Sequence, residues 1–251
     1  MVTNWFGYTK TRTHPRLRLF CFPYAGGGAS VFRTWYAALP TDIEVCPIEL
    51  PGRGRRFQEA PLLRVPSLVQ ALSEAIHPYL DMPFAFFGHS MGALISFELT
   101  RQLRREHGMT PDYLLVSAYS APQLQRNNVV THTLRDEELL EKLRKLEGTP
   151  KEVLEEPELL KLLFPTIRAD FELCDSYSYV PEPPLPCAIR AFGGLRDQVS
   201  GYNGLMAWRE QTSSSFELQM LPGDHFYLHT AQPLLLEFLK EIFQYGEVVK
   251  V

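Results

Sequence analysis

The chain has 251 residues, of which 45% are hydrophobic and 22% are charged. These fractions are close to those of globular proteins and exclude disordered, collagenous and coiled-coil classes. Lysine and arginine together number 25 against 29 aspartates and glutamates, and this net charge of -4 lacks the basic excess typical of nucleic-acid-binding proteins.

Short apolar runs alternate with longer segments of helical period along most of the chain. This alternation predicts the α/β class, with a mainly parallel central sheet flanked by helices. We expect the strands at Leu17–Phe22, Ile43–Ile48, Phe84–Phe87, Tyr113–Ser117, Ala188–Phe192 and Phe216–Leu221. The helices are expected near Val31–Ala38, Ser67–Leu80, Met91–Glu106, Leu205–Gln211 and Pro233–Phe243.

A charged segment of helical character interrupts the alternation between residues 121 and 186. Apolar residues recur there at i, i+4 and i+7, first near residue 140 and again after Pro165, which predicts two amphipathic helices. The apolar positions are Leu139, Leu143 and Leu146, followed by Ile167, Phe171 and Cys174. The segment is either a plain solvated helical face or a mobile cover over a site on the sheet. We assign residues 1–120 and 187–251 to the core domain and 121–186 to a helical lid insertion.

The segment Gly88–Gly92 reads GHSMG and matches the G-x-S-x-G pattern between an expected strand and an expected helix. A sharp strand-turn-helix of this kind strains the serine backbone, and small residues two positions away on each side let the turn close. The pattern predicts that Ser90 is a nucleophile whose hydroxyl projects above the sheet. The alternative is a structural glycine turn that carries a serine by chance.

A serine hydroxyl needs a base to accept its proton and a carboxylate to hold that base in the right tautomer. Of the histidines after Ser90, His107 ends a helix and His132 enters the insertion, whereas His225 lies in the loop after the last strand. We therefore expect His225 to be the base. His229 completes an H-x-x-x-H pair, but no glutamate stands between the two histidines, which disfavours a metal site.

In α/β-hydrolases the acid precedes the histidine in the chain. Asp197 follows the strand before that of His225 and leaves room for one helix and one strand between them. We expect Asp197 to be the acid. The alternatives are Asp224, Asp170 and Asp175.

The oxyanion of an acyl-transfer intermediate requires backbone amides that are fixed in advance. One is expected at Met91, directly after the nucleophile, and a second in the loop Phe22–Ser30 after the first strand. We favour Ala25 for the second amide, with Gly26 next. A nucleotide-binding loop is disfavoured, because Val31 stands where that fingerprint needs glycine.

Together these motifs resemble the type II thioesterases that accompany non-ribosomal peptide synthetases and polyketide synthases. The resemblance covers nearly the whole chain. It implies an α/β-hydrolase fold with the triad Ser90, Asp197 and His225, the oxyanion amides of Met91 and Ala25, and a helical lid. The segments that carry it are Phe22–Gly27, Leu50–Arg56, Gly88–Gly92, Arg168–Phe171 and Gly223–Phe226.

The resemblance also implies a substrate and a partner. Such enzymes hydrolyse unwanted acyl groups from the phosphopantetheine thiol of acyl or peptidyl carrier domains, through an acyl-enzyme and without a cofactor. Two other hypotheses remain open. One is a serine esterase, acyl-CoA thioesterase or acyltransferase of the same fold, and the other is a carrier-binding protein with an idle triad.

Carrier domains are usually acidic, so basic clusters on this chain are candidate docking charges. They are otherwise ordinary surface or structural residues. The clusters are Arg53, Arg55 and Arg56, and Arg101, Arg104 and Arg105.

The chain shows neither a secretion signal nor a membrane-spanning apolar run, so we expect a cytoplasmic protein without membrane contact. We also expect a monomer that binds no nucleic acid. The cysteines form no C-x-x-C pair and are expected to be reduced core residues. They are Cys21, Cys46, Cys174 and Cys187.

Overall fold

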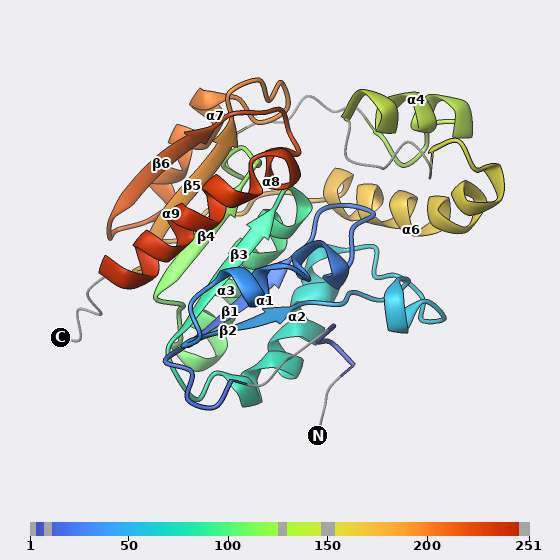
Figure 1. Cartoon of the computed structure of the whole chain (residues 1–251). Helices are drawn as coiled ribbons and strands as arrows, with labels where there is room; N and C mark the ends of the chain where they lie inside the picture. Colours follow the sequence, from blue (N-terminus) through green and yellow to red (C-terminus); the bar gives the residue numbers. More distant parts are fainter. Residues whose placement is uncertain (1–3, 8–11, 125–129, 147–153, 246–251) are drawn as a thin grey trace.

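The computed structural model describes residues 4–7, 12–124, 130–146 and 154–245 (Figure 1). Its centre is a six-stranded sheet with the order β2-β1-β3-β4-β5-β6, in which every neighbouring pair is parallel. This confirms the predicted α/β class. The strands are β1 (Leu17–Phe22), β2 (Ile43–Pro47), β3 (Phe84–His89), β4 (Tyr113–Ser117), β5 (Ala188–Gly194) and β6 (Phe216–Leu221).

All six predicted strands are present, and two of them run further than expected. β3 continues through Gly88 to His89, and β5 continues through Gly193 to Gly194. Glycine is a weak strand former, which is why the sequence suggested earlier ends. Here the glycines are held by parallel pairing, Gly88 opposite Val116 and Gly193 opposite Met220.

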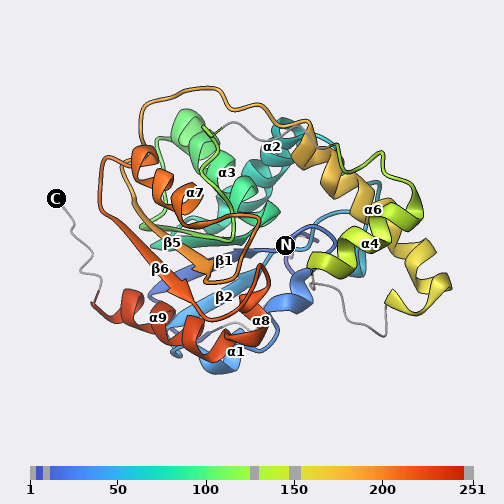
Figure 2. The same ribbon diagram turned by 90° about the horizontal axis from the view of Figure 1, so that it is seen from above.

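Helices cover both faces of the sheet (Figure 2). One face packs against α2, α3 and η4, and the other against α1, α8 and α9. The helical elements are η1 (Ala29–Phe32), α1 (Trp35–Ala38), η2 (Gly54–Arg56), α2 (Val65–Ile76), η3 (His77–Tyr79), α3 (Met91–His107), α4 (Asp136–Leu146), α6 (Pro157–Asp175), α7 (Tyr202–Met206), η4 (Ala207–Gln211), α8 (Tyr227–Thr230) and α9 (Gln232–Tyr245). None of the helices described here is long and apolar enough to cross a membrane.

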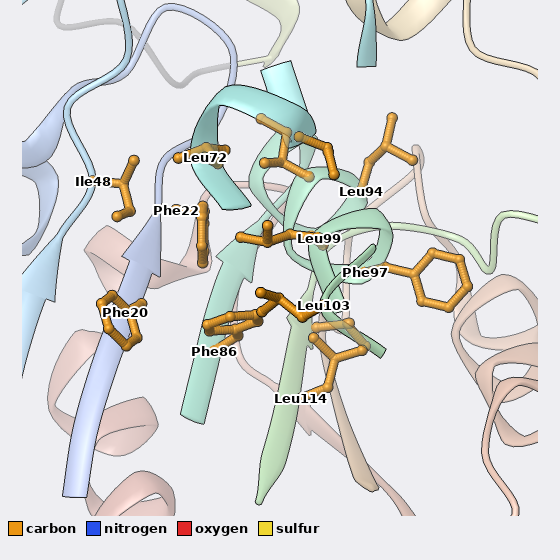
Figure 3. Packing of buried hydrophobic residues seen from close by; sticks show 14 of the residues in the cluster. Phe20, Phe22, Ile48, Leu72, Phe86, Leu94, Phe97, Leu99, Leu103 and Leu114 are labelled. Carbon is orange, nitrogen blue, oxygen red and sulfur yellow. The ribbon is translucent and has the colours of Figure 1, made fainter. Parts of the chain in front are cut away.

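The core follows the two-residue period of the strands. In β1, Phe20 and Phe22 face the layer of α2 and α3, while Leu19 and Cys21 face the opposite layer. Figure 3 shows α3 packed on the first of these faces through its apolar side chains. Cys21, Cys46 and Cys187 are buried reduced thiols, as predicted, whereas Cys174 is only partly buried.

The insertion contains both expected helices, but the second begins earlier than predicted. The apolar spacing suggested a helix after Pro165, whereas α6 starts at Pro157 and carries Pro165 in its interior. Proline removes one helical hydrogen bond and does not by itself end a helix that other contacts hold. Thr166, directly after it, donates to Gly52 O at 2.7 Å and fixes α6 on the core. Residues 125–129 and 147–153 of the insertion lie outside the described residues.

The parallel strands bring several loops to one edge of the sheet. All six strands run in the same direction, so their carboxyl ends lie at one edge of the sheet. The segments that follow β1, β3, β5 and β6 therefore begin at that edge. β1 lies between β2 and β3, so the connection from β1 to β2 runs toward one edge of the sheet and the connection from β2 to β3 runs back past β1 toward the other. Such a switch point is where open α/β sheets bind their ligands.

Candidate active site

Ser90 joins β3 to α3 in a strained conformation. Its φ of 54° and ψ of -117° lie in a region that residues with a side chain rarely adopt. The Ser90 amide donates to Ser117 O at 2.7 Å, which ties the turn to β4. A Cβ atom at Gly88 would lie 2.1 Å from Gly92 O, so the turn closes only because residue 88 lacks a side chain. This is the strand-turn-helix that the sequence predicted.

The close backbone contact at Gly92 predicts that alanine destabilises the protein there, although helix propensity alone favours alanine. Alanine favours a helix over glycine by about 1 kcal/mol, but a Cβ at Gly92 would lie 2.1 Å from Phe22 O. Overpacking against backbone costs about 1–3 kcal/mol or more. A 2.1 Å contact with a backbone oxygen belongs at the upper end of that cost. After the gain in helix propensity is subtracted, we expect Gly92→Ala to lower the free energy of unfolding by about 2 kcal/mol, measured by urea denaturation. Gly201→Ala is the control, because no neighbour lies within 4 Å of its Cβ position, and an equal loss in both variants would contradict the account.

The structure brings Ser90, His225 and Asp197 together in one hydrogen-bonded line. His225 Nε2 lies 3.0 Å from Ser90 Oγ, and His225 Nδ1 lies 2.9 Å from Asp197 Oδ2. His225 and Asp197 are buried, and Ser90 is half-buried. These distances suit proton transfer from the serine to the imidazole and orientation of the imidazole by the carboxylate.

Backbone pairing holds the two loops that carry His225 and Asp197 against each other. The amide of Leu195 donates to Leu221 O, and the amide of Arg196 donates to Gly223 O, both at 2.8 Å. A Cβ at Gly194 would lie 2.1 Å from Asp224 O, so glycine is needed for this close approach.

The carboxylate of Asp197 has several hydrogen-bond donors around it. It accepts hydrogen bonds from the Val199 amide at 2.7 Å, from the Ser200 hydroxyl and from His225. Burial raises the pKa of Asp197, but the hydrogen bond and charge of His225, with the bonds from Ser200 and Val199, outweigh burial and lower the pKa to about 2. The carboxylate is therefore ionised at neutral pH. Sequence reasoning missed Ser200, although a serine three residues after an aspartate suits such a contact.

The alternative acids are engaged elsewhere. Asp224 accepts from the amide of Phe226 at 2.8 Å, and Asp175 lies 2.9 Å from the imidazole of His132. Asp170 forms a buried ion pair with Arg53. None of these three carboxylates has a hydrogen bond to His225 among the described residues.

His225 and His229 have different partners. His229 Nε2 lies 2.9 Å from the Tyr24 hydroxyl, whereas both ring nitrogens of His225 contact the other two members of the line. Burial lowers the pKa of His229, so a neutral ring is favoured at pH 7. The alternative of a shared metal therefore gains no support from the geometry.

The backbone amides that are candidates for binding an oxyanion differ in their hydrogen bonds. Met91 is the first residue of α3, and amides in the first turn of a helix have no acceptor within the helix. In the loop after β1, the Gly26 amide donates to Asp170 Oδ2 at 2.7 Å and the Gly27 amide to Tyr24 O at 2.9 Å. This favours Ala25 over Gly26.

His89 lies fully buried beside the site and was not singled out in the sequence. Its ring centroid is 5.6 Å from that of His225, and its Nδ1 lies 2.8 Å from Ser117 Oγ. Burial, together with the positive charges that His225 and His229 can carry, lowers the pKa of His89 well below 6.5. A buried neutral ring thus lies beside the imidazole of His225.

The low pKa of His89 predicts a dependence of stability on pH. Below pH 6.5 the unfolded chain binds a proton at this residue and the folded chain does not, so lowering the pH favours unfolding by about 1.4 kcal/mol per pH unit. We expect urea denaturation between pH 6.5 and 5 to give a free energy of unfolding that falls about this much more steeply for the wild type than for His89→Gln. Parallel curves would contradict the burial of a neutral imidazole.

The basic clusters are mostly internal. Arg53 and Arg56 are buried, Arg56 pairs with Glu59 at 2.6 Å, and Arg55 donates to backbone carbonyls of residues 6 and 7. The interpretation of these arginines as free docking charges is therefore wrong for Arg53 and Arg56. These guanidinium groups hold loops together.

The arginines of the second cluster also form ion pairs within the chain. Arg101, Arg104 and Arg105 all form ion pairs with Glu182, at 2.8, 2.8 and 2.5 Å. Arg101 is buried and also pairs with Glu98 at 2.6 Å. The interpretation of Arg101 as a docking charge is therefore wrong. The ion pairs of the cluster hold the segment before β5, which carries Glu182, against α3.

The sequence and the fold of this chain are similar to those of known thioesterases. The thioesterase domain family model matches residues 17–243. The gramicidin S biosynthesis protein GrsT of Aneurinibacillus migulanus is 46% identical over 95% of this chain and 93% of its own.

Two solved structures are also similar. RedJ, a thioesterase from the prodiginine biosynthetic pathway in Streptomyces coelicolor, is 37% identical, with a TM-score of 0.86 over 92% of this chain and 87% of its own. The type II thioesterase BorB from the borrelidin biosynthetic cluster is 36% identical, with a TM-score of 0.87 over 96% of this chain and 98% of its own. The sheet and its flanking helices are those of the α/β-hydrolase fold, and the chain belongs to the thioesterase domain family.

Proposed function

We propose that this protein is a type II thioesterase that removes aberrant or stalled acyl groups from the phosphopantetheine thiol of carrier domains. The observation that carries the proposal is the hydrogen-bonded line of Ser90, His225 and Asp197 in a chain of the thioesterase domain family. The similar proteins GrsT, RedJ and BorB belong to gramicidin S, prodiginine and borrelidin biosynthesis, and this supports a role in peptide or polyketide synthesis.

In the first half-reaction Ser90 Oγ attacks the thioester carbonyl carbon while His225 Nε2 accepts the hydroxyl proton. The carbonyl oxygen becomes an oxyanion, and the amides of Met91 and Ala25 donate hydrogen bonds to it. The C–S bond then breaks, the acyl group stays on Ser90, and the pantetheine sulfur leaves with the proton from His225. Asp197 stays ionised and stabilises the imidazolium that forms.

In the second half-reaction a water molecule replaces the thiol. His225 takes a proton from the water, and the resulting hydroxide attacks the acyl-enzyme carbonyl. Collapse of the second oxyanion breaks the ester bond, returns the proton to Ser90 and releases a carboxylic acid. Each half-reaction uses the same three side chains and the same two amides, so no cofactor is needed.

We propose that residues 121–186 form a lid over this site and that residues 1–120 and 187–251 form the catalytic core. The position of α4 and α6 supports this, because both lie beyond the end of the sheet and α6 contacts the loop after β1 (Figures 1 and 2). α4 and α6 share a small apolar core that includes Leu139, Leu143, Leu160, Phe164 and Ile167. We further propose that the protein acts as a cytoplasmic monomer.

Mass spectrometry of acyl-loaded carrier domains tests the proposal directly. We expect the carrier to lose the mass of its acyl group, with a higher kcat/KM than for the matched acyl-CoA or p-nitrophenyl ester. A preference for the ester or for acyl-CoA would identify a general hydrolase of this fold. Binding of the carrier without hydrolysis of any of the three substrates would identify an idle triad. Either result would contradict the proposal.

A further inference from the structure

A helix of the insertion contacts the loop after β1 through one buried ion pair. Asp170 of α6 accepts two hydrogen bonds from Arg53, Oδ1 from Nη2 at 2.7 Å and Oδ2 from Nη1 at 2.8 Å. Both side chains are less than 10% exposed. The same Asp170 Oδ2 accepts the amide of Gly26 at 2.7 Å, and Arg53 Nη1 donates to Gly27 O at 2.9 Å. The pair therefore holds the Ala25–Gly26 peptide through its N–H and the Gly27–Gly28 peptide through its carbonyl oxygen.

The loop itself makes a tight turn around Ala25. The Gly27 amide donates to Tyr24 O at 2.9 Å, and Gly26 between them has a φ of +78°. A hydrogen bond from the fourth residue to the first, with positive φ at the third, is the pattern of a type II turn. Tyr24 O belongs to the same planar peptide as the Ala25 amide, so holding that oxygen sets the direction in which the Ala25 N–H points.

The attachment of α6 does not depend on this pair alone. Thr166 donates to Gly52 O at 2.7 Å, and Glu172 pairs with Arg64 at 2.6 Å, both outside the loop after β1. The Arg53–Asp170 pair differs from these contacts because it also makes hydrogen bonds to the backbone of the turn, at Gly26 N and Gly27 O. A carboxylate that accepts from a backbone amide and from a guanidinium forms charge-assisted bonds, which are shorter and stronger than neutral ones.

We propose that Asp170 and Arg53 are positioning residues for the oxyanion amide of Ala25. The buried pair orders the Tyr24–Gly27 turn, and the turn aims the Ala25 N–H at the carbonyl oxygen bound at Ser90. The insertion thereby acts on the chemical step through α6 as well as covering the site. This inference rests on the proposed function, because it takes the Ala25 amide as an oxyanion donor.

The kinetics of two substitutions at Asp170 test the inference. Asp170→Ala removes both the acceptor for Gly26 and the partner of Arg53, and it should lower kcat about 10²-fold, the lower end of the range for loss of one oxyanion donor. Asp170→Asn keeps one carbonyl acceptor and should lose about tenfold. Because the interaction is made with the transition state, we expect KM to change less than twofold. The pH midpoint of kcat/KM should stay in place, because His225 and Asp197 are untouched.

Glu172→Gln is the matched control. It removes an ion pair between the same helix and the core without touching the turn, so kcat should stay within twofold of the wild type. Rates are expressed per folded protein, determined by circular dichroism and gel filtration. If Asp170→Ala does not fold, Asp170→Asn and Arg53→Lys are compared with the control in the same way.

Three results would overturn the inference: folded Asp170 variants with the kcat of the control, a loss confined to KM, or a shifted pH midpoint. All variants are assayed with a p-nitrophenyl ester as well as with an acyl-carrier, since both reactions form an oxyanion. A wild type that cleaves the ester but not the carrier thioester contradicts the proposed function. The kcat values of the variants with the ester still test the positioning role in that case.

Discussion

Ser90→Ala should reduce turnover of an acyl-carrier thioester about 10⁶-fold, the scale of known triad knockouts. The substitution removes the only atom of the line that bonds to substrate, and neither His225 nor Asp197 can replace it. Single-turnover hydrolysis of an acyl-carrier, followed by mass spectrometry, measures the loss. Carrier binding should be unchanged, because the hydroxyl contributes to the reaction rather than to recognition of the carrier.

Ser200→Ala is a useful comparison in the same assay, since it removes a nearby buried hydroxyl that donates to Asp197 and does not touch the carbonyl carbon. We expect it to retain far more activity than Ser90→Ala. Ser90→Ala protein with turnover near that of the wild type would remove Ser90 from the mechanism.

Asp197→Asn should lower kcat by about 10⁴-fold, as loss of the carboxylate does in serine proteases that use the same arrangement. The ionised carboxylate holds the proton of His225 on Nδ1, which leaves Nε2 free to accept the serine proton. An asparagine amide placed there can donate to Nδ1 and hold the opposite tautomer. The pH profile of kcat/KM from pH 5 to 9 measures the effect on the imidazole as well as on the rate.

Asp224→Asn is the matched control for this second variant, because Asp224 precedes His225 in the chain and accepts from the Phe226 amide instead. The asparagine oxygen can keep that bond, so activity should stay within a few-fold of the wild type. An active Asp197→Asn enzyme beside an inactive Asp224→Asn enzyme would move the acid to Asp224.

Local sequence patterns were sufficient to predict most of the sheet and the turn that carries Ser90. Short apolar runs located all six strands. The strained turn at Ser90 was predictable because G-x-S-x-G places glycine at two close backbone contacts, Gly88 against Gly92 O and Gly92 against Phe22 O. His225 and Asp197 could be chosen because each follows a strand that ends at the same edge of a parallel sheet.

The sequence could not predict contacts that depend on how distant elements pack. Asp170 was considered as a catalytic acid, and Arg53 as a docking charge, because nothing in the local sequence shows that they neutralise each other. The same applies to Glu182, which pairs with the arginines of α3. The interior position of Pro165 in α6 depends on the contacts that hold this helix on the core.

The most direct test of the account is detection of the acyl-enzyme. The protein is mixed with an acyl-carrier thioester, quenched in acid within the first turnover, digested and analysed by mass spectrometry. The account predicts the mass of the acyl group on the peptide that contains Ser90, and no such adduct in Ser90→Ala. Two results would contradict the account. One is complete hydrolysis of the thioester without any acyl group on Ser90, and the other is an acyl group on a different residue that is still labelled in the Ser90→Ala variant.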